Sequence, residues 1–218
     1  MAEVAICVFA KPPRAGEAKT RLTPAVGAEG AAELARAFIT DTWSQVTRLP
    51  WARPLLASTG AWPEGLLPVR AEVWPQGEGD LGARMERILL RALDECPAAM
   101  ALGADSPGLP VAHLEAAWAA LEHADAVFGP SDDGGFYLLA LRRLPVGALE
   151  NLPWSQPETL ARTEERLKSL GLTVARVAPF FDVDVPADLE RLETELNAGR
   201  LQAPATAAVL ATFQRLRR

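Results

Sequence analysis

The sequence predicts an α/β protein with a mostly parallel sheet and helices on both faces. Short continuous apolar runs rich in β-branched residues alternate with longer segments whose apolar residues recur every three or four positions. The first pattern is typical of strands buried on both faces, and the second of helices with one buried side. Strands that alternate with helices of this length usually build parallel sheets, because each crossover helix returns the chain to the same edge.

The first half of the chain contains four predicted strands and two predicted helices. The apolar run at 4–10 stops at Lys11 and predicts the first strand. The segment 28–46 predicts a helix whose buried face comprises Leu34, Phe38, Ile39, Thr42, Trp43 and Val46. Further strands are expected at 53–59, 71–76 and 98–104. Asp80 is expected to cap a helix whose apolar face comprises Leu81, Met85, Ile88, Leu89 and Ala92.

The second half continues the alternation. The segment 111–122 predicts a helix with one apolar side formed by Val111, Leu114, Ala117, Trp118 and Leu121. Three strands are expected, at 125–130, 135–141 and 172–178. Helices are expected near 157–170, 186–197 and 204–216. No internal repeat or low-complexity linker interrupts the pattern, so we expect residues 1–218 to form a single domain.

Composition excludes several classes of protein. The chain has 218 residues, of which 49% are hydrophobic and 23% charged, which is typical of a soluble globular protein. Its net charge of −6 and lack of a basic tract argue against a nucleic-acid or membrane-surface binder. Cys7 and Cys96 have neither disulfide-framework nor zinc-site spacing, so we expect a cytoplasmic protein. His113 and His123 are expected to be packing or surface residues.

The loop at 11–22 is unusually cationic. It contains Lys11, Lys19 and Arg21, and only one other lysine occurs in the whole chain. Ammonium and guanidinium groups around Gly16, between a buried strand and a helix, would suit a nucleotide polyphosphate. The alternative is a solvated basic turn. The loop matches neither the Walker A pattern nor the dinucleotide-binding glycine pattern.

Acidic residues follow two other strands. Asp105 lies too far before the next helix to serve as its N-cap, and a carboxylate at a strand end is well placed to hold a divalent cation. A simple Asp-Ser-Pro turn is the alternative. Asp182 and Asp184 either bind metal or neutralise the N-terminus of the helix that follows. A phosphatase of the haloacid-dehalogenase type is disfavoured, because its nucleophile loop would open the domain.

Two glycine-containing segments complete the set of candidate site loops. Asp133, next to Gly134 and Gly135, could accept hydrogen bonds from ligand hydroxyls, or the segment could be only a hairpin turn. The segment with Gln76, Gly79 and Asp80 suits contact with a base or ribose, or it is a turn followed by a helix cap.

Five motifs in this order resemble a bacterial GT-A-type family loosely described as glycosyltransferases: FAKPPRAGEAKTRL, LGADSPGLP, GPSDDGGFYLLAL, LPWSQPETL and FDVDVPADL. This family is related to the 2-phospholactate guanylyltransferases and the molybdenum-cofactor nucleotidyltransferases. The resemblance implies a GT-A fold of the nucleotide-diphospho-sugar transferase type and a bound Mg²⁺ or Mn²⁺. It implies that Asp105 and Asp184 hold the metal, with Asp182 as the substitute ligand, and that Lys19 and Arg21 hold phosphate. The glycine-rich loop of sugar nucleotidyltransferases is replaced here by a loop with prolines and lysine.

We therefore expect a nucleotidyltransferase that transfers a nucleotidyl group from a nucleoside triphosphate to a small phosphorylated acceptor and releases pyrophosphate. The expected catalytic residues are Lys19, Arg21 and Asp105, and the nucleotide is expected to contact Lys11, Gly16, Lys19, Arg21, Gln76, Gly79 and Asp80. The expected acceptor contacts are Asp133, Gly134, Gly135 and Trp154. Two alternatives remain: a glycosyltransferase that uses a nucleotide-diphospho-sugar, and a non-catalytic nucleotide-binding module. No nucleic-acid, membrane or obligate protein partner is expected.

Overall fold

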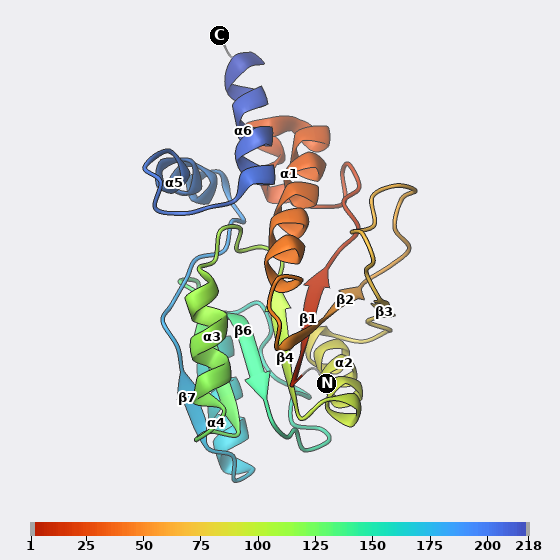
Figure 1. Cartoon of the computed structure of the whole chain (residues 1–218), viewed down its shortest axis with the longest axis vertical. Helices are drawn as coiled ribbons and strands as arrows, with labels where there is room; N and C mark the ends of the chain where they lie inside the picture. Colours follow the sequence, from red (N-terminus) through yellow and green to blue (C-terminus); the bar gives the residue numbers. More distant parts are fainter. Residues whose placement is uncertain (1–2, 217–218) are drawn as a thin grey trace.

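A seven-stranded sheet forms the centre of the protein (Figure 1). The computed structural model describes residues 3–216. The strand order is β3-β2-β1-β4-β6-β5-β7, and β6 runs antiparallel to both of its neighbours while the other strands run parallel. The strands are β1 (Val4–Ala10), β2 (Ala52–Ser58), β3 (Val73–Pro75), β4 (Ala98–Gly103), β5 (Ala126–Pro130), β6 (Phe136–Leu141) and β7 (Val174–Arg176). The predicted mostly parallel α/β sheet is confirmed.

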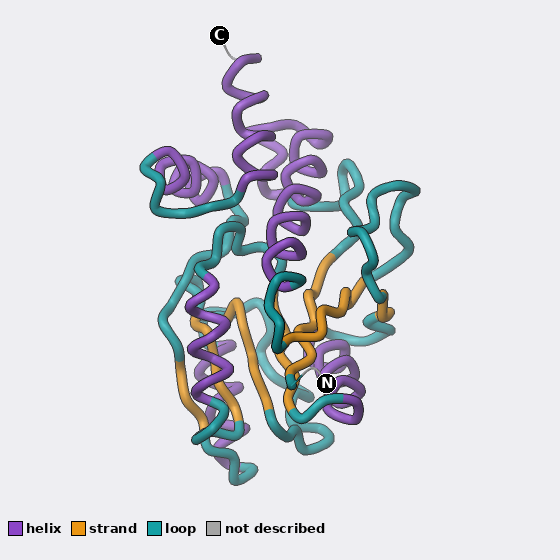
Figure 2. The backbone as a smooth tube through the Cα atoms, viewed as in Figure 1, coloured by secondary structure: helices purple, strands orange, loops and turns teal. Residues whose placement is uncertain are grey.

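Helices cover both faces of this sheet, as predicted (Figure 2). The helices are α1 (Thr23–Val46), α2 (Leu81–Glu95), α3 (Val111–Ala120), α4 (Thr159–Ser169), α5 (Pro186–Asn197) and α6 (Pro204–Leu216). Residues of α1 and α3 join one buried cluster with the sheet, and residues of α2 and α4 join the other.

Strand β1 shows why a continuous apolar run is needed at the centre of such a sheet. Val4, Ile6 and Val8 belong to the cluster under α1 and α3, whereas Ala5 and Cys7 belong to the cluster under α2 and α4. Because side chains alternate between the two faces of a strand, both sets must be apolar. All five are fully buried. Each large aliphatic side chain buried in this way contributes roughly 1.5–3 kcal/mol relative to exposure.

The last two helices pack against α1 beyond the sheet. A third buried cluster, separate from the two on the faces of the sheet, joins α1 and the turn before it to the segment after β7. It includes Leu22, Leu34, Phe38, Phe181, Val183, Leu189, Leu192 and Leu210. Asp41 of α1 fixes α6, because its carboxylate accepts hydrogen bonds from the backbone N–H groups of Ala205 and Thr206 and from the Thr206 hydroxyl. The segment after β7 is thereby held close to the start of α1.

Three predicted details differ from the structure. The strands expected at 71–76 and 172–178 have only three residues each, since β3 and β7 are the two edges of the sheet and pair on one side only. The helix predicted to start at 28 is preceded by an additional turn from Thr23, and the non-helical Gly27 separates the two parts of α1. Val111 is 37% exposed because it is the first residue of α3, where the helix has only begun to cover the sheet.

Other expectations concern single residues and the whole chain. Cys7 and Cys96 are buried free thiols, and burial raises the pKa of Cys7 to about 12. His113 packs edge-on against Phe180 and contacts the Tyr137 hydroxyl at 2.8 Å, in keeping with a packing role. No helix within residues 3–216 combines the length and the hydropathy needed to span a membrane.

Candidate functional site

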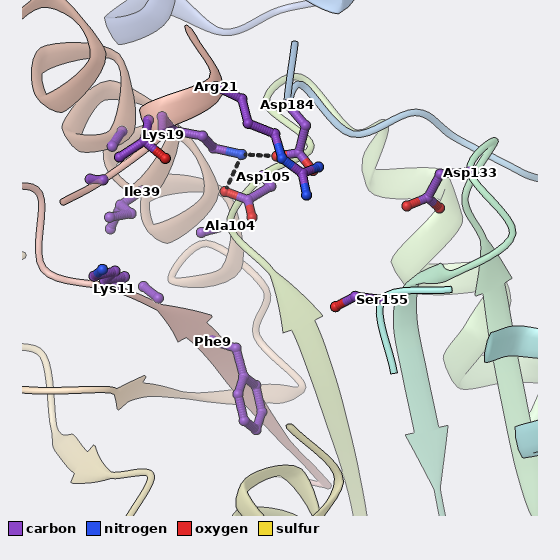
Figure 3. A pocket seen from close by; sticks show the side chains of 14 residues that line it. Phe9, Lys11, Lys19, Arg21, Ile39, Ala104, Asp105, Asp133, Ser155 and Asp184 are labelled. Atoms are coloured by element: carbon purple, nitrogen blue, oxygen red, sulfur yellow. Dashed lines mark hydrogen bonds and ion pairs between the residues drawn. The ribbon is translucent and has the colours of Figure 1, made fainter. Parts of the chain in front are cut away.

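The loops that follow β1, β4 and β5, and the segment after β7, meet at the carboxyl ends of these strands, which we call the carboxyl edge of the sheet. They enclose a cavity of about 370 Å³ (Figure 3). The four strands point toward the same edge, so segments far apart in sequence come together there. Polar side chains line much of this cavity: Lys11, Lys19, Thr20, Arg21, Asp105, Asp133, Ser155 and Asp184. This is the edge at which the sequence predicts the chemistry.

Lys19 is directed into the cavity by the turn that precedes α1. Its backbone is left-handed, with φ of 47°, and it is followed by a single 3₁₀ turn at Thr20–Leu22. Leu22 is fully buried in the third cluster and its N–H donates to the Lys19 carbonyl at 2.9 Å. A left-handed conformation is costly for a residue with a Cβ, so the surrounding packing must hold it in place.

The Lys19 ammonium lies between two carboxylates. Its Nζ is 2.7 Å from Asp105 Oδ1 and 2.8 Å from Asp184 Oδ1. The Lys19 side chain is only 8% exposed, whereas the two carboxylates are about half exposed toward the cavity. Burial by itself would lower the pKa of Lys19, but the charges and hydrogen bonds of both carboxylates raise that pKa above its ordinary value. The three residues are therefore one charged cluster.

The backbone brings Asp105 and Asp184 together. The N–H of Val183 donates to the Asp105 carbonyl at 2.8 Å, so the 182–184 segment runs beside the end of β4. Asp184 then faces Lys19, and Arg21 Nη1 lies 3.9 Å from Asp184 Oδ2. Asp105 takes no part in capping α3, as expected from its distance along the chain. The capping role considered for Asp182 and Asp184 belongs to Asp188, which accepts from two N–H groups before α5.

Asp182 forms no ion pair with Lys19 that the structure records. Its Oδ1 accepts a short hydrogen bond from the Ser106 hydroxyl, and it lines a neighbouring cavity together with Asp105. The pKa of Asp182 is raised to about 6, mainly by burial. The Ser106 hydrogen bond and the charge of Lys19 oppose this rise, and the negative charges of Asp105 and Asp133 add to it. Of the two acids expected near the end of the chain, Asp184 is thus the one that faces Asp105 across the cluster.

The pair Asp105 and Asp184 fits a divalent cation that is shared with a ligand. Each carboxylate has one oxygen on Lys19, and the other oxygen of Asp184 lies 3.9 Å from Arg21 Nη1. Hard oxygen donors of this kind are those that Mg²⁺ prefers. Within residues 3–216 no group of three His, Cys, Asp or Glu side chains is close enough to hold an ion. Mg²⁺ commonly binds through one or two carboxylates, with water and phosphate oxygens completing its shell. The two residues therefore suit an ion that arrives with phosphate.

A second cavity of about 290 Å³ adjoins the first and shares Lys11 and Asp105 with it. Gln76 lines this second cavity and is buried, with its Nε2 donating to the Ala57 carbonyl at 2.9 Å. Its Oε1 accepts from Arg84 at 3.3 Å. Together the two cavities form an elongated depression along the sheet edge, from the Gln76 side to the Asp133 side.

The turn between β5 and β6 forms the far wall. The sequence left open whether this segment is a hairpin or a ligand contact, and the structure shows a hairpin whose Asp133 side chain lines the cavity. Asp133 Oδ1 accepts hydrogen bonds from the Ser131 hydroxyl at 2.6 Å and the Gly135 N–H at 2.9 Å. Gly134 has a φ of 88°, and a Cβ there would lie 2.0 Å from the Pro157 carbonyl oxygen. The 155–157 segment therefore rests directly on this turn.

The cavity is lined by Ser155, which the sequence analysis missed, and not by Trp154, which was expected to contact the acceptor. Trp154 packs edge-on against Phe136 and closely against Gly82, and its buried Nε1 has no hydrogen-bond partner among the described residues. The left-handed φ of 58° at Ser155 turns this residue toward the opening. Only its position next to Trp154 in the fourth motif could have drawn attention to it.

Five residues predicted to contact the nucleotide or the acceptor line neither cavity: Gly16, Gly79, Asp80, Gly134 and Gly135. Gly16 lies in an exposed turn with φ of 76°. Gly79 has φ of 107°, and Asp80 caps α2 by accepting from the Ala83 N–H at 2.8 Å. The cap considered as the alternative for Asp80 is thus present. Gly134 and Gly135 shape the turn beneath Asp133.

Comparison with solved structures confirms the predicted fold. A candidate nucleotide-diphospho-sugar transferase from Desulfovibrio desulfuricans G20 is 29% identical, with a TM-score of 0.88 over 99% of this chain and 97% of that one. The 2-C-methyl-D-erythritol 4-phosphate cytidylyltransferase from Thermus thermophilus is 18% identical, with a TM-score of 0.56 over 89% of this chain and 99% of that one. A CMP:2-keto-3-deoxy-manno-octonic acid synthetase complexed with CTP is 16% identical, with a TM-score of 0.58 over 92% of this chain and 100% of that one.

The descriptions of these three neighbours name a candidate nucleotide-diphospho-sugar transferase, a synthetase complexed with CTP and a cytidylyltransferase. The two neighbours under 25% identity show likeness of fold alone. No curated protein matches the chain in sequence. The profile of one protein family matches residues 42–156, which is more than half of the sequence. The chain belongs to this family, which is described as uncharacterized proteins conserved in bacteria (DUF2064).

Proposed function

We propose that the protein is a metal-dependent nucleotidyltransferase, which transfers a nucleotidyl group from a nucleoside triphosphate to a small acceptor and releases pyrophosphate. The observation that carries this proposal is the cluster of Lys19, Asp105 and Asp184 in one cavity at the carboxyl edge of the sheet. The motifs that resemble the 2-phospholactate guanylyltransferases and molybdenum-cofactor nucleotidyltransferases support the same class. The buried free thiols Cys7 and Cys96 suit a reducing compartment, so we place this activity in the cytoplasm.

The residues of the cavity would act by binding and by neutralising charge. Lys11, Lys19 and Arg21 would bind the triphosphate, since all three line the same side of the cavity. Asp105 and Asp184 would hold a Mg²⁺ or Mn²⁺ ion, which neutralises phosphate charge when bound. When Asp105 and Asp184 hold the metal ion, Lys19 would no longer be paired with them. It would then be free to contact phosphate oxygens and to stabilise the charge that develops on the leaving pyrophosphate.

Positioning of the donor and the acceptor would account for most of the remaining rate enhancement, because phosphoryl transfer needs little covalent catalysis by the protein. The cavity lined by Gln76 would accommodate the nucleoside, with the phosphates extending past Lys11 toward Lys19. The acceptor would enter beside Asp133, on the wall opposite the cationic segment. This arrangement would aim the acceptor at the α-phosphorus while the leaving group points toward the lysines.

A glycosyltransferase is the second candidate, and one observation favours it. The candidate nucleotide-diphospho-sugar transferase is similar across almost the whole of both chains. The same cations and carboxylates would bind the diphosphate of a nucleotide-diphospho-sugar as well as a triphosphate. Product analysis separates the two reactions, since nucleotidyl transfer releases pyrophosphate and glycosyl transfer releases a nucleoside diphosphate.

A thermal-shift screen tests the proposal. We expect at least one nucleoside triphosphate or nucleotide-diphospho-sugar to raise the Tm of the protein, and Mg²⁺ or Mn²⁺ to increase that shift, because a ligand that binds only the folded form stabilises it. Asp105→Asn should abolish the metal-dependent part. Asp132→Asn is the matched control, because Asp132 pairs with Arg191 and does not line the cavity. If no donor of either class changes the Tm, the proposed function is wrong.

A further inference from the structure

The basic side chains of the main cavity come from one segment, and two of them, Lys19 and Arg21, lie beside Asp105 and Asp184. The basic lining residues Lys11, Lys19 and Arg21 all come from the segment after β1, whereas Asp133 and Ser155 lie on the opposite side (Figure 3). Among the described residues that line the cavity, none on that opposite side is basic. The cavity therefore offers a phosphate strong binding groups only on the side of the segment after β1. The opposite side, where the acceptor would bind, offers a carboxylate and a hydroxyl.

Asp133 is held in a fixed orientation with one oxygen to spare. Its Oδ1 is engaged by the Ser131 hydroxyl and the Gly135 N–H, both within 2.9 Å. Its Oδ2 makes no hydrogen bond or ion pair with the part of the protein that the structure describes, and the side chain is exposed to the cavity. The turn thus presents a single carboxylate oxygen that can accept a hydrogen bond from a ligand.

Ser155 lies on the same side of the cavity as Asp133, at a conformational cost. A left-handed backbone is strained for a non-glycine residue, and Ser155 adopts it with φ of 58°. The segment is clamped on both sides: the Thr159 hydroxyl contacts the carbonyls of Pro153 and Gln156 at 2.6 and 2.7 Å, and Pro157 rests on Gly134. The Ser155 hydroxyl has no protein partner within residues 3–216. Strain that surrounding contacts maintain in this way is characteristic of residues that bind ligands.

We propose that the acceptor attacks through an uncharged hydroxyl group that Asp133 and Ser155 hold, and that its reacting end carries no phosphate. This inference rests on the proposed function and replaces the phosphorylated acceptor expected from the sequence. A phosphate at the Asp133 wall would approach the carboxylate of Asp133, whereas the basic side chains of the cavity, together with the acids Asp105 and Asp184 beside them, lie toward the opposite side. A hydroxyl avoids this repulsion, since it can donate to Asp133 and accept from Ser155.

The proposed step balances for either donor. With a nucleoside triphosphate, the acceptor oxygen forms a bond to the α-phosphorus while the bond from that phosphorus to the bridging oxygen of the β-phosphate breaks. Pyrophosphate leaves with the electron pair, and the acceptor proton passes to Asp133 Oδ2. With a nucleotide-diphospho-sugar, the oxygen bonds to the anomeric carbon, the nucleoside diphosphate leaves with the electron pair, and Asp133 again takes the proton. Asp133 would be the base in both cases.

The test compares Asp133→Asn with Asp132→Asn. Asn can keep the hydrogen bonds of Oδ1, so the first variant should fold, which its Tm will check. Asp132 is the adjacent carboxylate; it pairs with Arg191 and does not line the cavity, so its variant removes the same charge one residue away. Consumption of a donor identified by thermal shift is measured with water and with paired acceptors, each a small polyol and its phosphate monoester. We expect Asp133→Asn to lower kcat by about 100-fold, in the range of general-base catalysis, with donor affinity unchanged.

Ser155 is tested through the KM for the polyol acceptor. Ser155→Ala and Ser155→Gly both remove the hydroxyl, but glycine also relieves the left-handed strain. We expect both variants to raise this KM by a similar factor, with a smaller change in kcat. If Ser155→Gly instead behaves like the wild type while Ser155→Ala does not, only the backbone matters and the assigned contact is wrong.

The outcomes separate this inference from the proposed function. If donors bind and are consumed but Asp133→Asn behaves like Asp132→Asn, the acceptor inference fails and the transferase proposal stands. Preference for the phosphate monoester, with a KM that falls in Asp133→Asn because repulsion is removed, would also overturn the inference alone. If no donor binds, the proposed function fails first.

Discussion

At the scale of single residues, Lys19 both neutralises the two acids of the site and would compete with a metal ion for them. Its ammonium is the counter-ion of Asp105 and Asp184 and takes one oxygen of each, so a divalent cation that bridged the same two oxygens would have to displace it. Metal binding and the ion pairs of Lys19 therefore compete. Nucleotide would relieve this competition by offering phosphate oxygens to the lysine, which predicts that nucleotide and metal bind more tightly together than separately.

This competition predicts the effect of Lys19→Met on metal binding. Without nucleotide, the variant should bind Mn²⁺ about tenfold more tightly than the wild type, because no ammonium has to be displaced from the carboxylates. Calorimetry or Mn²⁺ electron paramagnetic resonance measures this affinity. Lys11→Met is the matched control, since Lys11 lines the same cavity but forms no ion pair that the structure records. Equal Mn²⁺ affinity in the two variants would contradict the competition.

Asp182 predicts a pH dependence of stability. Its pKa is raised to about 6 in the folded protein, mainly by burial, compared with about 3.9 in an unfolded chain. The folded state therefore binds this proton more tightly, and the contribution of Asp182 to the free energy of unfolding decreases as pH rises from about 4 to about 6. We expect Asp182→Asn to gain stability relative to the wild type over this range, by up to about 3 kcal/mol.

Urea unfolding in EDTA at about pH 4 and about pH 8 measures that gain. The control is Asp94→Asn, which removes an exposed carboxylate of α2. A difference between Asp182→Asn and the wild type that is the same at both pH values would show that Asp182 does not titrate in this range.

The central site residues were predictable and their contacts were not. Lys19 and Asp105 follow the buried strands β1 and β4, and Asp184 follows the edge strand β7. The carboxyl ends of these parallel strands converge, so the approach of the three residues follows from sequence. That Lys19 pairs directly with both acids depends on its left-handed backbone, which no local pattern signals for a lysine. Ser155 was missed for a similar reason, because packing of Pro157 on Gly134 brings it to the cavity.

At the scale of elements, the β5–β6 turn and the 155–157 segment form one unit. Gly134→Ala should lower the free energy of unfolding by about 3 kcal/mol, combining left-handed strain with overlap against the Pro157 carbonyl. Gly171→Ala is the control, because Gly171 has a similar φ of 77° but open space around it, and should cost only about 1 kcal/mol. Urea denaturation measures both; equal losses would show that the contact with Pro157 contributes nothing.

Elements at the centre of the sheet were predicted more accurately than those at its edges. Strands such as β1 and β4 are buried on both faces, so the whole element must be apolar and its ends are readable. The edge strands β3 and β7 pair on one side only, and flanking apolar residues such as Leu172 are buried without joining a strand. Apolar sequence therefore overestimates strand length wherever neighbouring packing, rather than pairing, covers the side chains.

At the scale of the whole molecule, the third cluster connects the two ends of the site. It joins the turn after Lys19 to the segment that contains Asp184, through Leu22 and Val183. The helices α5 and α6 complete this cluster, and Asp41 fixes α6 to α1. The chain after β7 is thus both a structural support for α1 and the carrier of one acid of the site. Loosening it should loosen the site.

Asp41→Ala tests this coupling. The variant leaves two N–H groups and a hydroxyl at the start of α6 without their shared acceptor, so we expect a loss of about 2–4 kcal/mol in unfolding free energy and faster hydrogen exchange in residues 180–210 than in β1 and β4. Urea denaturation and exchange mass spectrometry measure these. Glu195→Gln is the control, since it removes the same charge from α5 but breaks only the surface pair with Arg200, worth about 1 kcal/mol at most. Uniformly faster exchange across the sheet in Asp41→Ala would mean that the C-terminal layer does not open separately, and that Asp41 acts on global stability alone.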